Sequence, residues 1–187
     1  MKGAAIVIVL LLLLGFGAVE YVAVRNDLVR QREAVDAQWA NVEAVLQRRA
    51  GPIPNLVETV KGFARRETET YQSIADARAA LAGAHTPQEK IQANEQISGA
   101  LSRLLAITEN YPKLRFNKNL LRLQDEFSDS EYRIAVERRK YNEALQHYNA
   151  SIDMFPGNCV AALAGFHRND AYFKTGPGAA GAPKAKF

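Results

Sequence analysis

An uncharged apolar run at the amino terminus constrains this chain more than any other feature. Residues 4–19 contain no charged side chain, and only Glu20 interrupts the run before residue 24. A helix needs about 20 mostly apolar residues to cross the roughly 30 Å hydrocarbon core of a bilayer. We therefore expect residues 4–24 to form a transmembrane helix with Glu20 and Tyr21 at the interface, preceded by residues 1–3 as a flank.

The same run also has the length of the apolar region of a secretory signal peptide. Gly15-Phe16-Gly17 offers small residues at the spacing of a cleavage site, and no Cys follows for a lipoprotein signal. Because the helical pattern continues beyond residue 24 without a break, an uncleaved anchor is the favoured interpretation. Cleavage stays the alternative.

The basic residues beside the run bear on its orientation. Lys2 lies on one side, whereas Arg25, Arg30 and Arg32 lie on the other. Cytoplasmic flanks carry an excess of Lys and Arg, so this count leans toward a cytoplasmic position for the rest of the chain. The margin is small, and the side of the membrane stays open.

The net charge of +4 is unevenly distributed. Residues 25–155 hold 19 Lys/Arg and 18 Asp/Glu, and the excess lies mainly in residues 156–187. A short basic tail makes no broad basic face, so nucleic acid is not an expected partner. A single Cys excludes an internal disulfide, and no zinc-ligand spacing, phosphate loop or Ser/His/Asp set is present. We expect no metal, no cofactor, no catalytic residue and no enzymatic activity.

Apolar residues at steps of three and four predict four helices. In chain order these cover residues 24–50, 53–83, 87–111 and 120–155. Gly51-Pro52 ends the first, because proline removes an amide donor and disfavours helix in the residue before it. Thr86 and Glu89 form a capping box at the start of the third. The fourth keeps a seven-residue repeat as far as Pro156-Gly157.

These helices, joined by short connections, predict an architecture. No segment alternates with a two-residue period, so we expect an all-α protein without strands. We expect the transmembrane helix to continue into an elongated antiparallel four-helix bundle. The bundle domain covers residues 25–173 and ends in a short amphipathic helix over 158–173, and the Gly/Ala/Pro/Lys-rich residues 174–187 are a disordered tail.

A repeated Tyr-Asn pair is the first candidate site. Tyr141-Asn142 and Tyr148-Asn149 lie one heptad apart on the fourth helix. Asn is unfavourable inside a helix, so each amide is expected to have a partner. The pairs are interpreted as closing the bundle seam by bonding the connection at 51–55 or 111–117. The alternative is a groove that binds a small molecule or peptide.

Charged residues within the apolar stripes form a second group of candidates. They are Glu67, Arg78, Glu131 and Arg138. A buried unpaired charge is costly, so cross-helix ion pairs are the favoured interpretation, with a polar internal site or simple exposure as alternatives. Arg48 and Arg49 point about 100° apart on a helix and are expected on a solvated face.

Several uncommon motifs are spaced along residues 25–173. In chain order they are Arg48-Arg49, Ile53-Pro54-Asn55-Leu56-Val57-Glu58-Thr59-Val60-Lys61-Gly62, Leu101-Ser102-Arg103-Leu104-Leu105, Glu109-Asn110-Tyr111-Pro112, Arg139-Lys140-Tyr141-Asn142, Tyr148-Asn149, Phe155-Pro156 and Gly165-Phe166. Together they resemble the LemA family of bacterial proteins. The possible interaction or structural residues are Arg48, Arg49, Pro54, Asn55, Glu58, Tyr111, Pro112, Tyr141, Asn142, Tyr148, Asn149, Phe155 and Pro156.

The resemblance implies a single-pass amino-terminal segment and a long antiparallel helical bundle. It implies no established reaction, cofactor or catalytic residue. The chain departs from the family pattern between Arg49 and Ile53, where an acidic residue and a Leu are common and Gly51 and Pro52 stand here. We therefore expect a stiffer first interhelical turn.

The expected function is that of a non-enzymatic, membrane-anchored scaffold or interaction protein in the bacterial cytoplasmic membrane. Residues 4–24 contact the lipid bilayer, and the bundle assembles laterally with itself as a homo-oligomer or with envelope proteins. The alternative is a sensory or ligand-binding module that uses a groove near Tyr141, Asn142, Tyr148 and Asn149.

Overall fold

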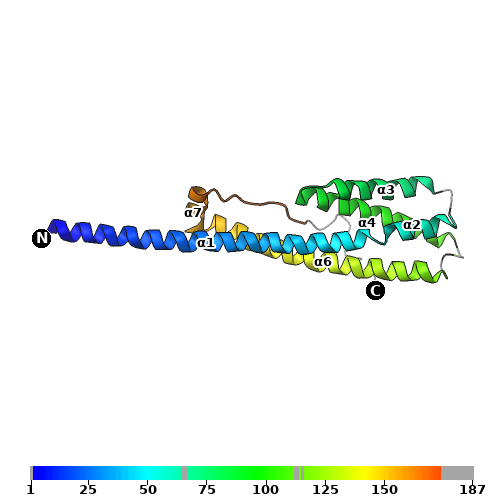
Figure 1. The fold of residues 1–187 in the computed structure, drawn as a ribbon, viewed down its shortest axis with the longest axis horizontal. Coiled ribbons are helices and arrows are strands. Elements are labelled where there is room, and N and C mark those ends of the chain that lie inside the picture. The colour runs from blue at the N-terminus through cyan, green and yellow to red at the C-terminus, as the bar shows by residue number, and fades with distance from the viewer. Residues whose placement is uncertain (1, 65–66, 112–113, 115, 174–187) are drawn as a thin grey trace, which may run out of the picture. The chain divides into compact units, whose positions relative to one another are not determined.

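The computed structural model describes residues 2–64, 67–111, 114 and 116–173. Its helices are α1 (Lys2–Ala50), α2 (Ile53–Lys61), α3 (Thr68–Gly83), α4 (Pro87–Glu109), α6 (Lys118–Asp153) and α7 (Gly157–Ala164) (Figure 1). No strand occurs in these ranges, and the predicted all-α class is confirmed. The predicted disordered tail, 174–187, lies outside the described residues.

The chain divides into two compact units. Unit 1 comprises residues 1–38 and 140–170, and unit 2 comprises residues 39–139 and 171–187. Helix α1 therefore contributes to both units, as does α6. Each unit has its own set of buried side chains.

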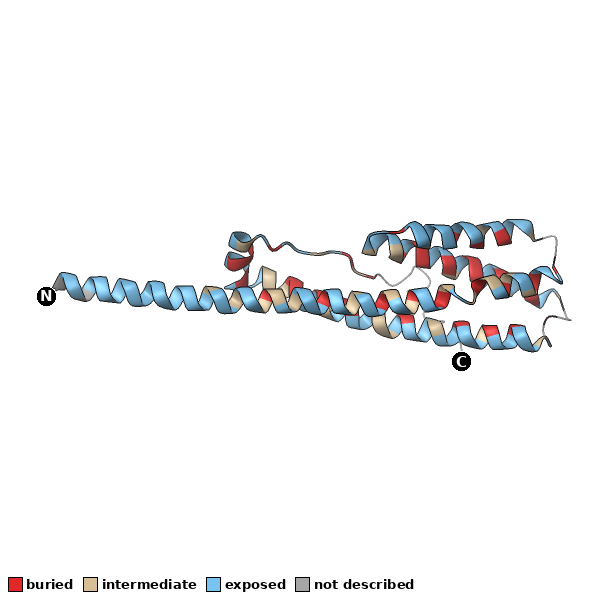
Figure 2. Ribbon diagram, in the orientation of Figure 1, coloured by how far each residue is buried: buried red, intermediate tan, exposed pale blue. Residues whose placement is uncertain are grey.

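Helix α1 is a single helix of 49 residues, as predicted for an anchor that continues into the first bundle helix. Its large side chains from Ile6 to Phe16 are all more than half exposed. From Leu28 onward an apolar stripe is buried, with Leu28, Val35, Val42 and Leu46 at most 4% exposed (Figure 2). The change from exposed to buried follows from sequence, because only the second part alternates apolar and polar faces.

Unit 2 buries a continuous apolar core between α2, α3, α4 and the first part of α6. Its largest fully enclosed members are Ile53, Leu56, Ile97, Leu104, Leu114 and Leu120. Helix α4 begins with the predicted capping box, in which the Thr86 hydroxyl accepts from Glu89 N and the Glu89 carboxylate accepts from Thr86 N. Successive helices α2, α3, α4 and α6 run in alternating directions (Figure 1).

The predicted second helix, 53–83, is wrong because it is two helices, α2 and α3. The break follows Gly62, where the amides of Phe63 and Ala64 both donate to Val60 O. The Tyr71 hydroxyl then donates to Ala64 O at 2.8 Å and fixes the reversal. Apolar spacing alone does not show this break, because Ala64 and Tyr71 are buried on the same core as α2.

The first interhelical reversal consequently lies after α2 and not at Gly51-Pro52. The end of α1 and α2 follow one another in one direction (Figure 1). Proline is well suited to the first turn of a helix, and Leu56 N donates to Pro52 O at 3.1 Å, so the helix resumes two residues after it stops. Gly51-Pro52 ends α1 as predicted, but it produces an interruption in place of a turn.

Unit 1 contains the apolar part of α1, the end of α6 and α7. The predicted fourth helix is confirmed as α6, which ends at Asp153 just before Pro156. The predicted helix 158–173 is wrong in its second half, because α7 ends at Ala164. Gly165 adopts a left-handed conformation with φ 73°, and Phe166 N donates to Ala161 O at 3.0 Å, which closes the helix end.

Candidate functional site

A buried arginine is the most unusual feature of unit 2. Arg49, on the last turn of α1, is only 3% exposed. Its Nη1 donates to Asn94 Oδ1 at 2.9 Å and to Ser98 Oγ at 3.0 Å, and its Nη2 forms an ion pair with the Glu131 carboxylate. One guanidinium therefore joins α1, α4 and α6.

The Arg49 cluster is electrostatically unbalanced. Burial lowers the pKa of Arg49, Glu131 opposes that shift, and the positive charge of Arg138 adds to it. Glu131 itself is about half exposed, and the Arg49 Nε and Asn94 Nδ2 atoms have no hydrogen-bond partner among the described residues. A buried cation is tolerated only with such compensation, so the cluster fixes the register of three helices.

The solvated position expected for Arg49 is wrong, whereas Arg48 is exposed as expected. The signal that could have placed Arg49 is its step of seven residues from Val42 and fourteen from Val35, which continues the buried stripe of α1. For Glu131 the expected cross-helix pairing is confirmed. Its partner was not predicted.

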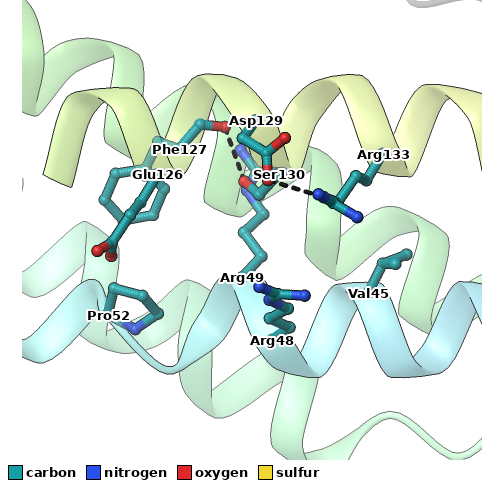
Figure 3. Close-up of a pocket in the computed structure, with 9 residues that line it drawn as sticks. All are labelled: Val45, Arg48, Arg49, Pro52, Glu126, Phe127, Asp129, Ser130 and Arg133. Carbon is teal, nitrogen blue, oxygen red and sulfur yellow. Dashed lines mark hydrogen bonds and ion pairs between the residues drawn. The ribbon is translucent and has the colours of Figure 1, made fainter. Parts of the chain in front are cut away.

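A pocket of about 300 Å³ opens beside the Arg49 cluster, within unit 2. Its lining residues are Val45, Arg48, Arg49, Pro52, Glu126, Phe127, Asp129, Ser130 and Arg133 (Figure 3). Arg133 Nε donates to Asp129 Oδ2 at 2.7 Å, so part of the wall is internally neutralised. Arg48 and the unpaired Nε of Arg49 leave an excess of positive charge for a small polar guest.

A second set of buried polar contacts lies in unit 1. Asn149 is 2% exposed, and its Nδ2 donates to Asn169 O at 2.7 Å while its Oδ1 accepts from Asn169 N at 3.0 Å. The Tyr148 hydroxyl donates to His167 O at 3.1 Å, and burial raises the pKa of Tyr148. The partner of the Tyr148-Asn149 pair is thus the segment 165–170 and not the connection at 51–55 or 111–117.

The last described residue, Phe173, packs on unit 2. Its ring stacks on Trp39 with centroids 6.1 Å apart, and the guanidinium of Arg138 lies 4.7 Å from its centre. Burial lowers the pKa of Arg138. Arg138 therefore contacts an aromatic ring, which the stripe pattern does not show. Of the other stripe charges, Arg78 is exposed and Glu67 is half-buried.

The remaining candidate residues do not gather at one place. On α2, Pro54 is half-buried, Asn55 is exposed, and Glu58 is an exposed partner of Lys61. Tyr111 packs partly buried against the unit 2 core, and Pro112 lies outside the described residues. In unit 1, Tyr141 is buried, Asn142 is half-buried, and Phe155 and Pro156 are exposed.

Sequence reasoning singled out neither Trp39 nor the chain beyond residue 165 as a binding element. Among the described residues, no group of three or more His, Cys, Asp or Glu side chains is arranged to hold a metal ion. The polar sites of both units consist of side chains that hold neighbouring segments together.

The fold and these sites define a class: a helical bundle protein with one apolar amino-terminal helix long enough to cross a membrane. The LemA family model matches residues 38–187, and the chain belongs to this family. The resemblance inferred from the spaced motifs is therefore confirmed.

Curated relatives extend the comparison. Magnetosome protein MamQ 2 and magnetosome protein MamQ 1 of Paramagnetospirillum magneticum are each 27% identical over 178 residues, covering 81% of this chain and 65% of the relative. Protein LemA of Metamycoplasma hominis is 27% identical over 142 residues, covering 75% of this chain and 65% of the relative. The chain thus spans 65% of the length of these relatives.

Proposed function

We propose that the chain is a membrane-anchored interaction protein, with residues 4–24 of α1 crossing the bilayer once. The observation that supports this is the exposure of an apolar helix. The most apolar 18-residue window of the described chain has a mean hydropathy of 2.5 and is 0% buried. A patch of this kind is unfavourable in water, and a helix of about 21 residues spans the hydrocarbon core at about 1.5 Å per residue.

Flotation of the full chain with lipid vesicles tests the crossing. The matched variant is Leu10→Arg with Leu13→Arg, since both side chains are exposed and their replacement removes no packing. We expect the unaltered chain to float with vesicles and to resist alkaline extraction, and the double variant to be extracted. Equal extraction of both would contradict the proposal.

The interaction role is supported by exposed apolar side chains at one end of unit 2. Phe63 follows α2 and is 43% exposed, and Phe116 and Leu121, at the start of α6, are 83% and 45% exposed. The end of α2 and the start of α6 lie at the same end of this unit (Figure 1). Clusters of exposed aromatic residues are typical of protein interfaces. The proposed partners are further copies of the chain or other envelope proteins.

Light scattering on the full chain in detergent tests self-assembly. Lateral assembly predicts a particle several times the monomer mass of 20.7 kDa. The variant Phe63→Ser with Phe116→Ser should return it toward the monomer without lowering helix content. A monodisperse monomer at every concentration would exclude the homo-oligomer and leave envelope proteins as partners.

A bacterial cytoplasmic membrane is the proposed location, and its side is accessible to experiment. In a Cys159→Ser background, Gln146→Cys places the only thiol at an exposed position of α6. Labelling by an impermeant thiol reagent in intact spheroplasts would place unit 1 outside. Labelling only after lysis would place it in the cytoplasm.

Ligand binding is the second candidate function, and the observation that favours it is the pocket beside Arg49. The groove near Tyr141, Asn142, Tyr148 and Asn149 is the weaker location, because the Tyr148 hydroxyl and the Asn149 amide already bond segment 165–170. A screen of small carboxylates by thermal shift, compared between the unaltered chain and Arg48→Ala, would distinguish this function. Stabilisation that depends on Arg48 would support it.

A further inference from the structure

An apolar corner joins α6 to α7 in unit 1. Residues 154–166 contain no charged side chain. Within them, Met154 is 64% exposed, Phe155 is 82% exposed and Leu163 is 79% exposed. We define the α7 corner as residues 154–166. Large apolar groups gathered in this way on a surface indicate an interaction site.

Helix α7 has one buried and one open face. Gly157, Val160 and Ala161 are buried against the rest of unit 1. Cys159 and Leu163, which are four residues apart and share a face, are exposed. The short helix is therefore anchored on one side and presents an apolar surface on the other.

The α7 corner lies against α1 at the end of the apolar run. A groove of about 360 Å³ is lined by residues of both: Ala23, Val24, Asp27, Leu28, Arg30, Ser151, Met154, Phe155, Pro156 and Gly157. Residues 23–24 are the last of the proposed transmembrane segment. Figure 1 shows α7 beside α1. The corner is thus held at the level where α1 leaves the hydrocarbon.

The charges at this level match a lipid surface. Arg25, Arg30 and Arg32 are exposed on α1, and the Arg32 guanidinium lies 5.6 Å from the centre of the Phe166 ring. Basic side chains beside an apolar face are favoured at the boundary between lipid headgroups and acyl chains. A stable protein interface buries about 800 Å² on each partner, more than three exposed side chains supply, whereas a bilayer accepts a small apolar insertion.

We propose that the α7 corner inserts Phe155, Leu163 and Met154 into the headgroup boundary of the bilayer that α1 crosses, and so fixes unit 1 against the membrane surface. This inference rests on the proposed membrane crossing of α1. The partner is the lipid itself, contacted a second time at a site far along the sequence from the anchor.

Depth measurement on the full chain in phosphatidylcholine–phosphatidylglycerol nanodiscs tests the inference. Cys159 is the only cysteine, is exposed and lies on the open face, so it takes an environment-sensitive fluorophore directly. Quenching is measured with lipids that carry a nitroxide near the headgroup. We expect at least twofold stronger quenching at Cys159 than at Gln146→Cys in a Cys159→Ser background, an exposed position on α6.

A deep control separates this inference from the anchor. Leu12→Cys in the Cys159→Ser background places the fluorophore in the middle of the apolar run. Quenching of this label by deep nitroxides, with Cys159 no more quenched than the Gln146→Cys position, would overturn the corner while the anchor stands. Absence of quenching at all three positions would overturn both.

A second probe avoids the chemical label. In a Trp39→Phe background, Phe155→Trp places the only tryptophan at the corner, and Tyr132→Trp places it at a 71% exposed position of α6. We expect brominated lipids to quench the first and not the second. Equal quenching would overturn the inference, as would efficient Cys159–Cys159 crosslinking without lipid quenching, because a second copy would then cover the corner.

Discussion

Asn149 exchanges two hydrogen bonds with the main chain of Asn169, one as donor at 2.7 Å and one as acceptor at 3.0 Å. A buried side-chain amide thus pairs with an extended segment as a neighbouring strand would. Asn149 is unfavourable for the helix in which it lies, and this pairing compensates for it. In unit 1 the amide holds the chain beyond α7 in place.

Replacing Asn149 by Leu should release residues 167–170. The amide and carbonyl of Asn169 lose the two partners that Asn149 provides, and the free energy of unfolding should fall by about 1–3 kcal/mol. Hydrogen exchange should accelerate at residue 169, while urea unfolding reports the overall loss. Gln146→Leu, at an exposed position one turn earlier, is the matched control and should change little. Unchanged exchange at residue 169 would contradict the assigned role.

Removing the half-exposed member of the Arg49–Glu131 pair should cost more than removing the buried one. Glu131→Ala leaves a guanidinium that is 3% exposed without its carboxylate, which should lower the free energy of unfolding by about 3–5 kcal/mol. Arg49→Met leaves a carboxylate that water reaches, and should cost about 1–2 kcal/mol. Chemical denaturation of both variants measures the order.

The double variant Arg49→Met with Glu131→Leu completes this test. It leaves no uncompensated charge, so it should be more stable than Glu131→Ala alone. If the double variant were the least stable of the three, the pair would contribute favourable energy beyond mutual compensation, and the predicted order would be wrong.

The sequence predicts the helical class, the anchor helix and its buried stripe, because these depend on local periodicity. The reversal after Gly62 was not predictable in this way, since Ala64 and Tyr71 continue the apolar spacing across it. The Arg49 cluster was missed because adjacent basic residues suggest a solvated face, although residue 49 continues the step of Val42. The Asn149–Asn169 contact joins residues 20 apart through an aperiodic segment, and no spacing rule predicts such a partner.

Gly157 should not tolerate a side chain. A Cβ at this position would lie 1.9 Å from the carbonyl oxygen of Ser151, which is main chain and cannot rotate away. Gly157→Ala should therefore cost about 2–3 kcal/mol and displace the start of α7. Gly99→Ala is the matched control, because Gly99 is a helical residue with open space at the same position, and it should stabilise α4 by about 0.5–1 kcal/mol. Thermal unfolding of the two variants in opposite directions confirms the prediction; a shared direction contradicts it.

The capping box of α4 should lose its contribution to stability in acid. The Glu89 carboxylate accepts hydrogen bonds from the main-chain amides of His85 and Thr86, which lower the pKa of Glu89. A carboxyl with a lowered folded-state pKa stabilises the fold above its unfolded value, about 4.3, and this stability is lost as the pH falls through the folded-state pKa. The difference in Tm between the unaltered chain and Glu89→Gln should therefore stay constant from pH 7 to about 5 and shrink below about 4.3. Glu33→Gln, at an exposed position of α1, provides the comparison. A Glu89→Gln difference that persists undiminished at pH 3 would show that the ionised carboxylate is not what caps the helix.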